Sequence, residues 1–226
     1  ANDCMIFILP VAAVLLGFVI ALLFKPTLDT SVKLLLAFSG AFLLSITIFE
    51  FLPELYATGN ENVGLFIMAG LLLQILLEFI SRGAEHGHLH LDKARKNIPW
   101  LLLVSLCVHS AFEGFPLSQN QDLVYGIVVH KIPIAIIISS FLLSSNISKL
   151  QIVAFLSVFA LMTPLGSYLG TLDIWSVTLK SSINAIVVGV LLHVSTTILF
   201  ESSKNHQFNA TKFGVILLGI TLAYLL

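Results

Sequence analysis

The sequence predicts an all-α integral membrane protein whose chain crosses the bilayer in eight helices. Its mean hydropathy is +1.02, and 58% of its residues are hydrophobic while only 10% are charged. About a quarter of the residues in a soluble globular domain are charged, so this composition excludes that class. The apolar residues also gather in runs of about 20, the length that a helix needs to cross a bilayer. Because the segments between these runs are short, we expect residues 1–226 to form a single transmembrane domain that contacts lipid and no nucleic acid.

The eight spans follow one another with little sequence between them. Hydropathy places them at approximately residues 5–24, 32–52, 63–82, 98–118, 122–143, 150–170, 178–200 and 210–226. The first run could instead be a signal peptide, but it lacks a basic start and exceeds the roughly 7–15 residues of a signal-peptide core. We therefore interpret it as a membrane span.

The distribution of basic residues predicts the orientation of the chain. Nine of the 11 Lys and Arg residues lie in or beside the connections between spans 1 and 2, 3 and 4, 5 and 6, and 7 and 8. The connections on the opposite side contain only Lys180, and Lys131 lies inside the fifth span. Because basic loops are retained in the cytoplasm, we expect both ends of this chain outside it. The membrane would be a plasma membrane or a bacterial inner membrane.

A short internal similarity links the second and seventh spans. The second contains Ile46-Thr-Ile-Phe-Glu50 and the seventh contains Thr197-Ile-Leu-Phe-Glu201. These spans cross the membrane in opposite directions, so spans 1–3 and 6–8 could be inverted repeats around central helices 4 and 5, an arrangement known in transporters. A match this short also arises by chance in apolar sequence.

Three good metal ligands lie within the fourth and fifth spans. His109 and Glu113 are one helical turn apart and share a face, Ser110 lies nearby, and His130 is in the fifth span. A charged side chain at the centre of a bilayer costs ~3 kcal/mol, so such groups usually face each other or a polar pathway. The alternative is that His109 and Glu113 only hold helices together. Two imidazoles and a carboxylate instead favour a divalent transition-metal site with positions left for water.

The fourth and fifth spans are predicted to be antiparallel neighbours, because only about four polar residues, 119–122, connect them. Pro116 and Pro133 are expected to interrupt these two helices near the ligands. Proline removes a backbone donor, and broken helices at membrane depth mark binding sites in many transporters.

The residues around these ligands resemble the Zrt/Irt-like (ZIP) family of metal transporters. His109-Ser-Ala-Phe-Glu113-Gly is similar to the family's fourth-helix motif, and Val129-His130-Lys-Ile-Pro133 is similar to its fifth-helix motif. Weaker similarities extend the resemblance to nearly the whole chain: Phe49–Glu54 in the second span, Met162–Gly166 in the sixth and Leu199–Glu201 in the seventh. The resemblance implies inward movement of Zn²⁺ or a similar ion by alternating access, and a homodimer as in many members.

The chain also departs from the commoner family pattern. Ile134 stands where that pattern has a metal-binding glutamate, Ser110 where it has asparagine, and Thr163 where it has a sixth-helix glutamate. Those residues help to build a second metal position in the family. The resemblance therefore implies a variant with a His-Lys fifth helix and one principal metal, bound by His109, Glu113 and His130.

Lys131 lies about nine residues into the fifth span, too deep to reach a headgroup easily. We expect its ammonium to take the place of a second cation and to pair with Glu113 or Glu50. Other polar residues are candidates for the pathway: Glu50 for the outer entrance, and Glu78 and Glu201 for the exit. His86, His88 and His90 in the predicted cytoplasmic loop 83–97 could capture metal, although a solvated loop with incidental histidines remains the alternative.

The sequence thus predicts a carrier of divalent transition-metal ions, with zinc as its cargo and no separate cofactor. Imidazole ligands favour Zn²⁺ over Ca²⁺ or Mg²⁺ but do not separate it from Fe²⁺, Mn²⁺, Co²⁺ or Cd²⁺. The alternative is an intramembrane zinc-dependent hydrolase, which would need a further acid or base at the depth of the site. Gln74 and His193 are interpreted as helix-packing groups rather than ligands.

Overall fold

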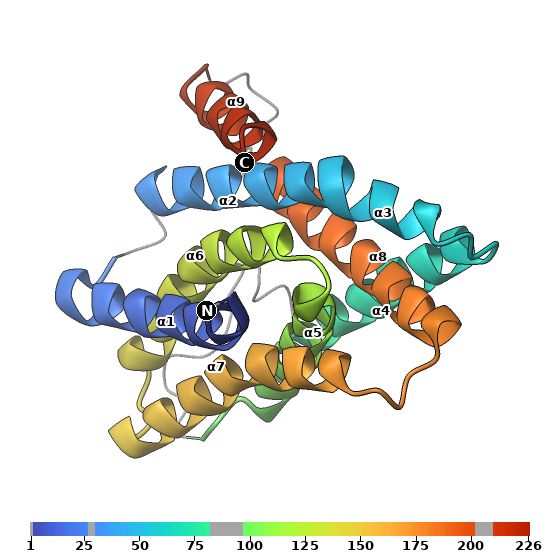
Figure 1. Cartoon of the computed structure of the whole chain (residues 1–226). Coiled ribbons are helices and arrows are strands. Elements are labelled where there is room, and N and C mark those ends of the chain that lie inside the picture. The colour runs from blue at the N-terminus through green and yellow to red at the C-terminus, as the bar shows by residue number, and fades with distance from the viewer. Residues whose placement is uncertain (1, 27–29, 82–96, 202–209) are drawn as a thin grey trace.

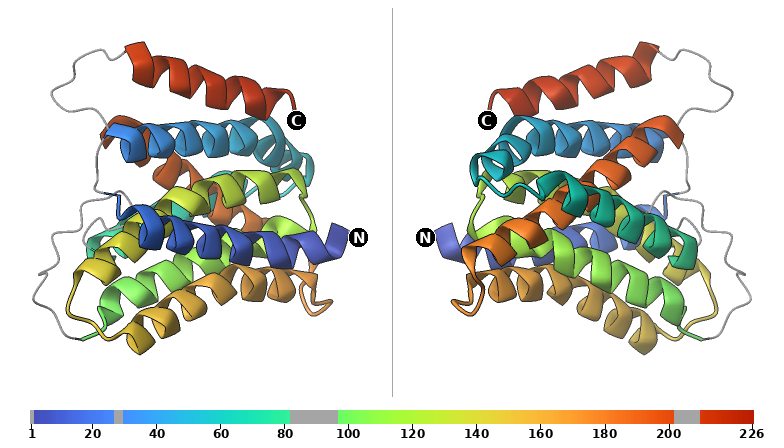
Figure 2. Two further views of the ribbon diagram at one scale, coloured as in Figure 1. Left: turned by 90° about the vertical axis from the view of Figure 1, so that its left-hand side faces the viewer. Right: turned by 90° about the vertical axis from the view of Figure 1, so that its right-hand side faces the viewer.

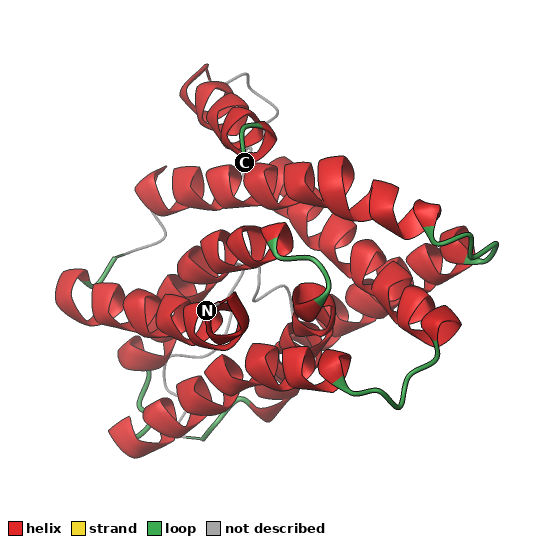
Figure 3. Cartoon of the chain, viewed as in Figure 1, coloured by secondary structure: helices red, strands yellow, loops and turns green. Residues whose placement is uncertain are grey.

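The computed structural model describes residues 2–26, 30–81, 97–201 and 210–226. Within these ranges the chain is helical with short connections and contains no strand (Figure 3). The helices that correspond to the predicted spans are α1 (Asn2–Phe24), α2 (Thr30–Ile46), α4 (Val63–Ser81), α5 (Trp100–Gly114), α6 (Asp122–Ser144), α7 (Lys149–Thr171), α8 (Val177–Glu201) and α9 (Ala210–Tyr224). Seven segments in the described ranges are long and apolar enough to cross a membrane, and α9 is a shorter apolar helix of 15 residues. The prediction of an all-α membrane fold is confirmed.

The second span is longer than the sequence predicted. Instead of ending near residue 52, α2 continues through the π-helical turn η1 (Thr47–Phe51) into α3 (Leu52–Ala57). In this turn the amide of Leu52 donates to the carbonyl oxygen of Thr47, five residues earlier. Pro53 follows directly and has no N–H to donate, so the wider turn lets the helix pass the proline without ending. Glu50 lies in this turn, and its side chain is exposed.

The two prolines of the fourth and fifth spans have different effects. Near Pro116 the α-helix ends, and the chain tightens into the 3₁₀ turn η3 (Phe115–Ser118). Pro133, in contrast, lies inside α6, which continues as an α-helix from Asp122 to Ser144. The prediction of a break at Pro133 is therefore wrong. Neighbouring helices can stabilise a proline inside a membrane helix, and Pro133 is itself buried among them.

The helices pack as two groups (Figure 1). In the first group, α1 packs along α6 and α7, and α5 packs along α7. In the second group, α8 packs along α4 and α2, and α9 packs along α2. The groups meet mainly where α2 contacts α6 and where α4 contacts α5. Both views in Figure 2 place α9 on one side of the molecule and α7 on the opposite side, with the two ends of the chain at the same end of the bundle.

Glycines set the closest contacts within each group. Gly166 of α7 faces the main chain of Ala111 in α5, and Gly70 of α4 faces the main chain of Ile186 in α8. A Cβ at either glycine would collide with a backbone carbonyl group. Small residues let membrane helices approach until their backbones touch, so each pair is held by extensive van der Waals contact.

The helix pairs recur in the order that an inverted repeat predicts. Exchanging spans 1–3 with spans 6–8, and span 4 with span 5, converts the α1–α6 pair into the α7–α5 pair. The same exchange converts the α4–α8 pair into the α9–α2 pair, and both of these pairs are present. The α4–α5 contact has no comparable α9–α6 counterpart among the described residues, so the repeat stays a prediction. The site described next lies where side chains of α5 and α6 meet, although these two helices pack mainly against α7 and α1 rather than against each other.

Candidate metal centre

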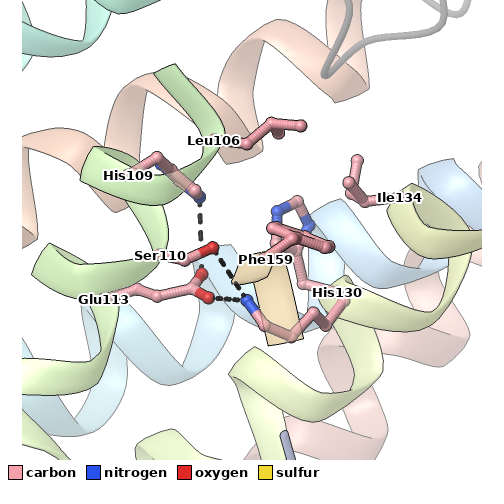
Figure 4. A pocket seen from close by; sticks show the side chains of 8 residues that line it. Leu106, His109, Ser110, Glu113, His130, Ile134 and Phe159 are labelled. Carbon is pink, nitrogen blue, oxygen red and sulfur yellow. Dashed lines mark hydrogen bonds and ion pairs between the residues drawn. The ribbon is translucent and has the colours of Figure 1, made fainter. Parts of the chain in front are cut away.

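The predicted ligands of α5 and α6 line one small buried cavity of about 10 Å³ (Figure 4). Its lining consists of Leu106, His109, Ser110, Glu113, His130, Lys131, Ile134 and Phe159. The structure thus brings together all four predicted metal-site residues and Lys131. A volume of this size holds about one water molecule. An ion could enter the cavity as it stands only after losing most of its hydration shell.

Glu113 is the centre of the polar contacts and is fully buried. One carboxylate oxygen, Oε1, accepts a hydrogen bond from the hydroxyl of Thr163 at 2.9 Å and forms an ion pair with the ammonium of Lys131. The other oxygen, Oε2, lies 3.4 Å from Nε2 of His109. The sequence presented Thr163 only as a departure from the family pattern, whereas its hydroxyl binds the site carboxylate directly.

Lys131 is 2% exposed and has three neighbours in the site. Besides its ion pair with Glu113, its ammonium donates to the Ser110 hydroxyl at 3.2 Å and lies 4.9 Å from the centre of the Phe159 ring. A cation over an aromatic face is stabilised further when it is shielded from water. Of the two partners that the sequence suggested for Lys131, the structure has Glu113. The other, Glu50, is exposed.

The two imidazoles lie close to the separation that one shared ion requires. Their ring centres are 6.3 Å apart and their planes are inclined by 68°. A zinc–nitrogen bond of about 2.0–2.1 Å allows two ligand rings to have centres up to about 6.4 Å apart, and less in a tetrahedral site. Among the residues that the structure describes, no group of three or more His, Cys, Asp or Glu side chains is already arranged to hold a metal. His109 and His130 would therefore have to move closer together, and Lys131 away from Glu113, before one ion could contact all three predicted ligands.

Apolar side chains close the site on both sides along the helices. On α6, Leu123 and Ile127 belong to one buried apolar cluster, and Ile134 and Ile138 belong to another. His130 and Lys131 lie between these clusters, so the polar groups form a thin layer in an otherwise apolar interior. We call His109, Ser110, Glu113, His130 and Lys131 the polar layer. Along α6, the polar layer is therefore bordered by apolar packing on both sides.

The other predicted residues lie apart from the polar layer or outside the described residues. Glu78 is partly buried on α4, and its Oε2 lies 3.5 Å from Nε2 of His193 on α8. That contact agrees with the interpretation of His193 as a helix-packing group. Glu50 is exposed in η1. The side chain of Glu201 and the loop residues His86, His88 and His90 lie outside what the structure describes.

Sequence reasoning missed a contact between α4 and the site. The side-chain oxygen of Gln74, a fully buried residue, lies 3.1 Å from Nδ1 of His109. The available signal was an uncharged polar residue in the middle of the third span, which we interpreted as helix packing only. Its distance along the sequence from His109 gave no indication that the two side chains meet.

Comparison with known proteins identifies the family. The family described as "ZIP Zinc transporter" matches residues 81–226, well over half of the chain, including all of α5 and α6. The chain belongs to the ZIP zinc transporter family. The matched range contains every residue of the polar layer, and it begins at the end of α4.

Three similar proteins match parts of the chain at 26–29% identity. The chain is 26% identical over 164 residues to protein zntD of Dictyostelium discoideum, a match that covers 62% of this chain and 24% of the relative. It is 29% identical over 139 residues to zinc transporter ZIP1 of Danio rerio, covering 58% of this chain and 46% of that protein. Zinc transporter ZIP1 of Takifugu rubripes is 29% identical over 134 residues, covering 56% and 44%. These matches thus span a quarter to a half of the length of the relatives.

Membership in the ZIP family also decides between the two classes considered from the sequence. The family consists of transporters rather than enzymes, so the intramembrane hydrolase loses its support. The chain is therefore a multi-pass membrane protein of a metal-transporting family.

Proposed function

We propose that this chain carries Zn²⁺, or a divalent transition-metal ion of similar chemistry, across the membrane into the cytoplasm by alternating access. The observation that carries the proposal is a buried pocket lined by His109, Glu113 and His130 in a chain of the ZIP family. Imidazole nitrogens and a carboxylate bind Zn²⁺ in preference to Ca²⁺ or Mg²⁺, while Fe²⁺, Mn²⁺, Co²⁺ and Cd²⁺ remain competing cargoes. Both fish relatives are named zinc transporters.

The residues of the polar layer favour the binding of one divalent ion at a time. Ile134 and Thr163 supply no carboxylate, and the ammonium of Lys131 already lies against Glu113. A second divalent cation beside the first would meet this positive charge at short range, where the low dielectric strengthens repulsion. We therefore assign Lys131 the place of the second cation.

Lys131 and the ion then alternate at Glu113. Without metal, the ammonium offsets the buried carboxylate, which would otherwise be strongly destabilised. When the ion arrives, Lys131 moves away from Oε1, and His109, Glu113 and His130 close around the ion. Ser110 is near enough to Lys131 to accept its ammonium and to add an oxygen ligand as the contacts rearrange.

The route through the protein uses the boundary between the two helix groups. The ion enters past Glu50 on the outer side and leaves past Glu78 and Glu201 toward the loop histidines His86, His88 and His90. The first group, which carries the polar layer, moves relative to the second. The four most extensive helix contacts, α1–α6, α4–α8, α5–α7 and α2–α9, all lie within the groups, and this supports the division, while α2–α6 and α4–α5 join the groups.

The remaining proposals concern the setting of the protein. The connections that contain most of the Lys and Arg residues lie on one side, which favours an orientation with both ends of this chain outside the cytoplasm. The membrane would be a plasma membrane or a bacterial inner membrane. The two ends of the chain at the same end of the bundle agree with an even number of crossings (Figure 2). A homodimer is proposed from the family resemblance alone.

Zinc uptake into sealed vesicles that contain the purified protein tests the function. We expect uptake that depends on the protein and is lost in His109→Ala. Cys107→Ser is the matched control, because Cys107 is on the same helix but packs against an apolar cluster instead of lining the cavity. Absence of zinc flux through the wild type, or full flux through His109→Ala, would overturn the proposal.

A further inference from the structure

Gln74 connects α4 to one of the predicted ligands on α5. Its carboxamide oxygen, Oε1, lies 3.1 Å from Nδ1 of His109, and both side chains are buried. A carbonyl oxygen can only accept, so the proton of this hydrogen bond belongs to Nδ1. A neutral imidazole protonated at Nδ1 has its lone pair on the other nitrogen, Nε2.

The other nitrogen of the ring points to the place where the ion is proposed to bind. Nε2 of His109 lies 3.4 Å from Oε2 of Glu113, so these two ligand atoms already face each other. If the amide of Gln74 presented its NH₂ group instead, Nδ1 would have to accept and Nε2 would carry the proton. A protonated nitrogen cannot bind a metal, so the orientation of one amide decides whether His109 is a competent ligand.

We propose that Gln74 is a positioning residue that holds His109 in the Nδ1–H form, with Nε2 directed at the ion. The proposal rests on the proposed function and adds a residue to it that does not touch the ion. Groups that bind the outer N–H of a metal-bound histidine fix both its proton and its ring orientation. Removing such a group typically lowers metal affinity or activity about 10–100-fold.

The neighbouring helical turn provides a matched control. The hydroxyl of Ser105 on α5 donates to the carbonyl oxygen of Leu77 on α4 at 2.8 Å. Like the contact of Gln74, it is a buried hydrogen bond between α4 and α5, but it reaches none of the predicted ligands. Ser105→Ala therefore removes a helix-to-helix bond without affecting the proton of His109.

Zinc uptake kinetics in vesicles can distinguish a role of Gln74 in positioning His109 from a general role in stabilising the helix packing. Gln74→Leu, which has no acceptor, should raise KM for zinc about 10–100-fold with little change in the maximal rate. Gln74→Glu keeps an acceptor oxygen and should restore a KM near that of the wild type, and Ser105→Ala should leave KM unchanged. Equal KM values for Gln74→Leu and Ser105→Ala would overturn the proposal.

The protonation of His109 can also be read directly. In ¹⁵N-histidine-labelled protein, with the signal assigned by its loss in His109→Ala, we expect the Nδ1–H form in the wild type and in Gln74→Glu. Gln74→Leu should show a mixture of both forms. A wild-type spectrum with the proton on Nε2 would overturn the inference whatever the variants do. Failure of the wild type to transport zinc would count against the proposed function, and the spectrum would still decide the role of Gln74.

Discussion

Replacing Lys131 with methionine tests how the empty site is stabilised. Methionine retains most of the length and apolar bulk of lysine but removes the charge. The carboxylate of Glu113, which is fully buried, then retains the hydrogen bond that the hydroxyl of Thr163 donates to Oε1 at 2.9 Å. The ion pair that offset its negative charge is gone.

The size of the effect follows from this burial. Removing one partner of a buried ion pair destabilises a protein by about 3–5 kcal/mol, so metal-free Lys131→Met should be less stable than the wild type by roughly that amount. A bound zinc ion returns positive charge to Glu113 and no longer has to displace the lysine. If binding recovers even about 1.4 kcal/mol of the loss, the variant binds zinc about tenfold more tightly. Uptake at saturating zinc should fall, because the ion is released from the variant less readily.

Zinc affinity is measured on purified protein in detergent by competition with a fluorescent chelator, and stability by thermal unfolding with and without zinc. Lys149→Met is the control for loss of a positive charge, since Lys149 is exposed at the start of α7. Zinc affinities and unfolding midpoints that are equal in Lys131→Met, Lys149→Met and the wild type would refute the role given to Lys131.

Three further results are expected. Gly70→Ala should lower stability by about 1–3 kcal/mol, because its Cβ meets the α8 backbone. Gly64→Ala on the same helix points into open space and should leave stability unchanged. Equal unfolding midpoints for the two variants would contradict this packing. Thr163→Val should lower stability by about 1.5–3 kcal/mol through the lost hydrogen bond to Glu113, and Ser167→Ala, whose hydroxyl makes no hydrogen bond among the described residues, serves as its control. Zinc uptake should fall as the pH drops from about 7.5 to about 5.5, because protons compete with metal for imidazole nitrogens; a rate that rises steadily through this range would count against the proposed ligands.

Most of the fold could be predicted from hydropathy because a bilayer demands long, uninterrupted apolar helices. The limits of the spans were less predictable where proline is involved. Hydropathy ended the second span near residue 52 and Pro133 was expected to interrupt the fifth, yet the chain passes Pro53 after a π-helical turn and Pro133 within a continuous α-helix. Local sequence shows the missing N–H but not the surrounding helices that stabilise the backbone around it.

The sequence predicts those site residues that are close together in the chain or lie on consecutive spans. The four-residue spacing of His109 and Glu113 fixes their shared face, and the short connection to the fifth span brings His130 near. Thr163 and Gln74 reach the site from α7 and α4, and no sequence periodicity reports on which distant helices become neighbours. The residues that surround and orient the ligands therefore required coordinates.

The hydrogen bond between His109 and Gln74 joins a helix of the first group to a helix of the second. Sliding one group past the other by a single helical turn, about 5.4 Å, would take the amide out of reach of the ring. His109 would then lose its hydrogen bond to Gln74 and bind the ion less tightly. Both changes would occur during the same movement that carries the ion inward. A single displacement would thus change the site from high to low affinity for the ion, while the ligands stay the same.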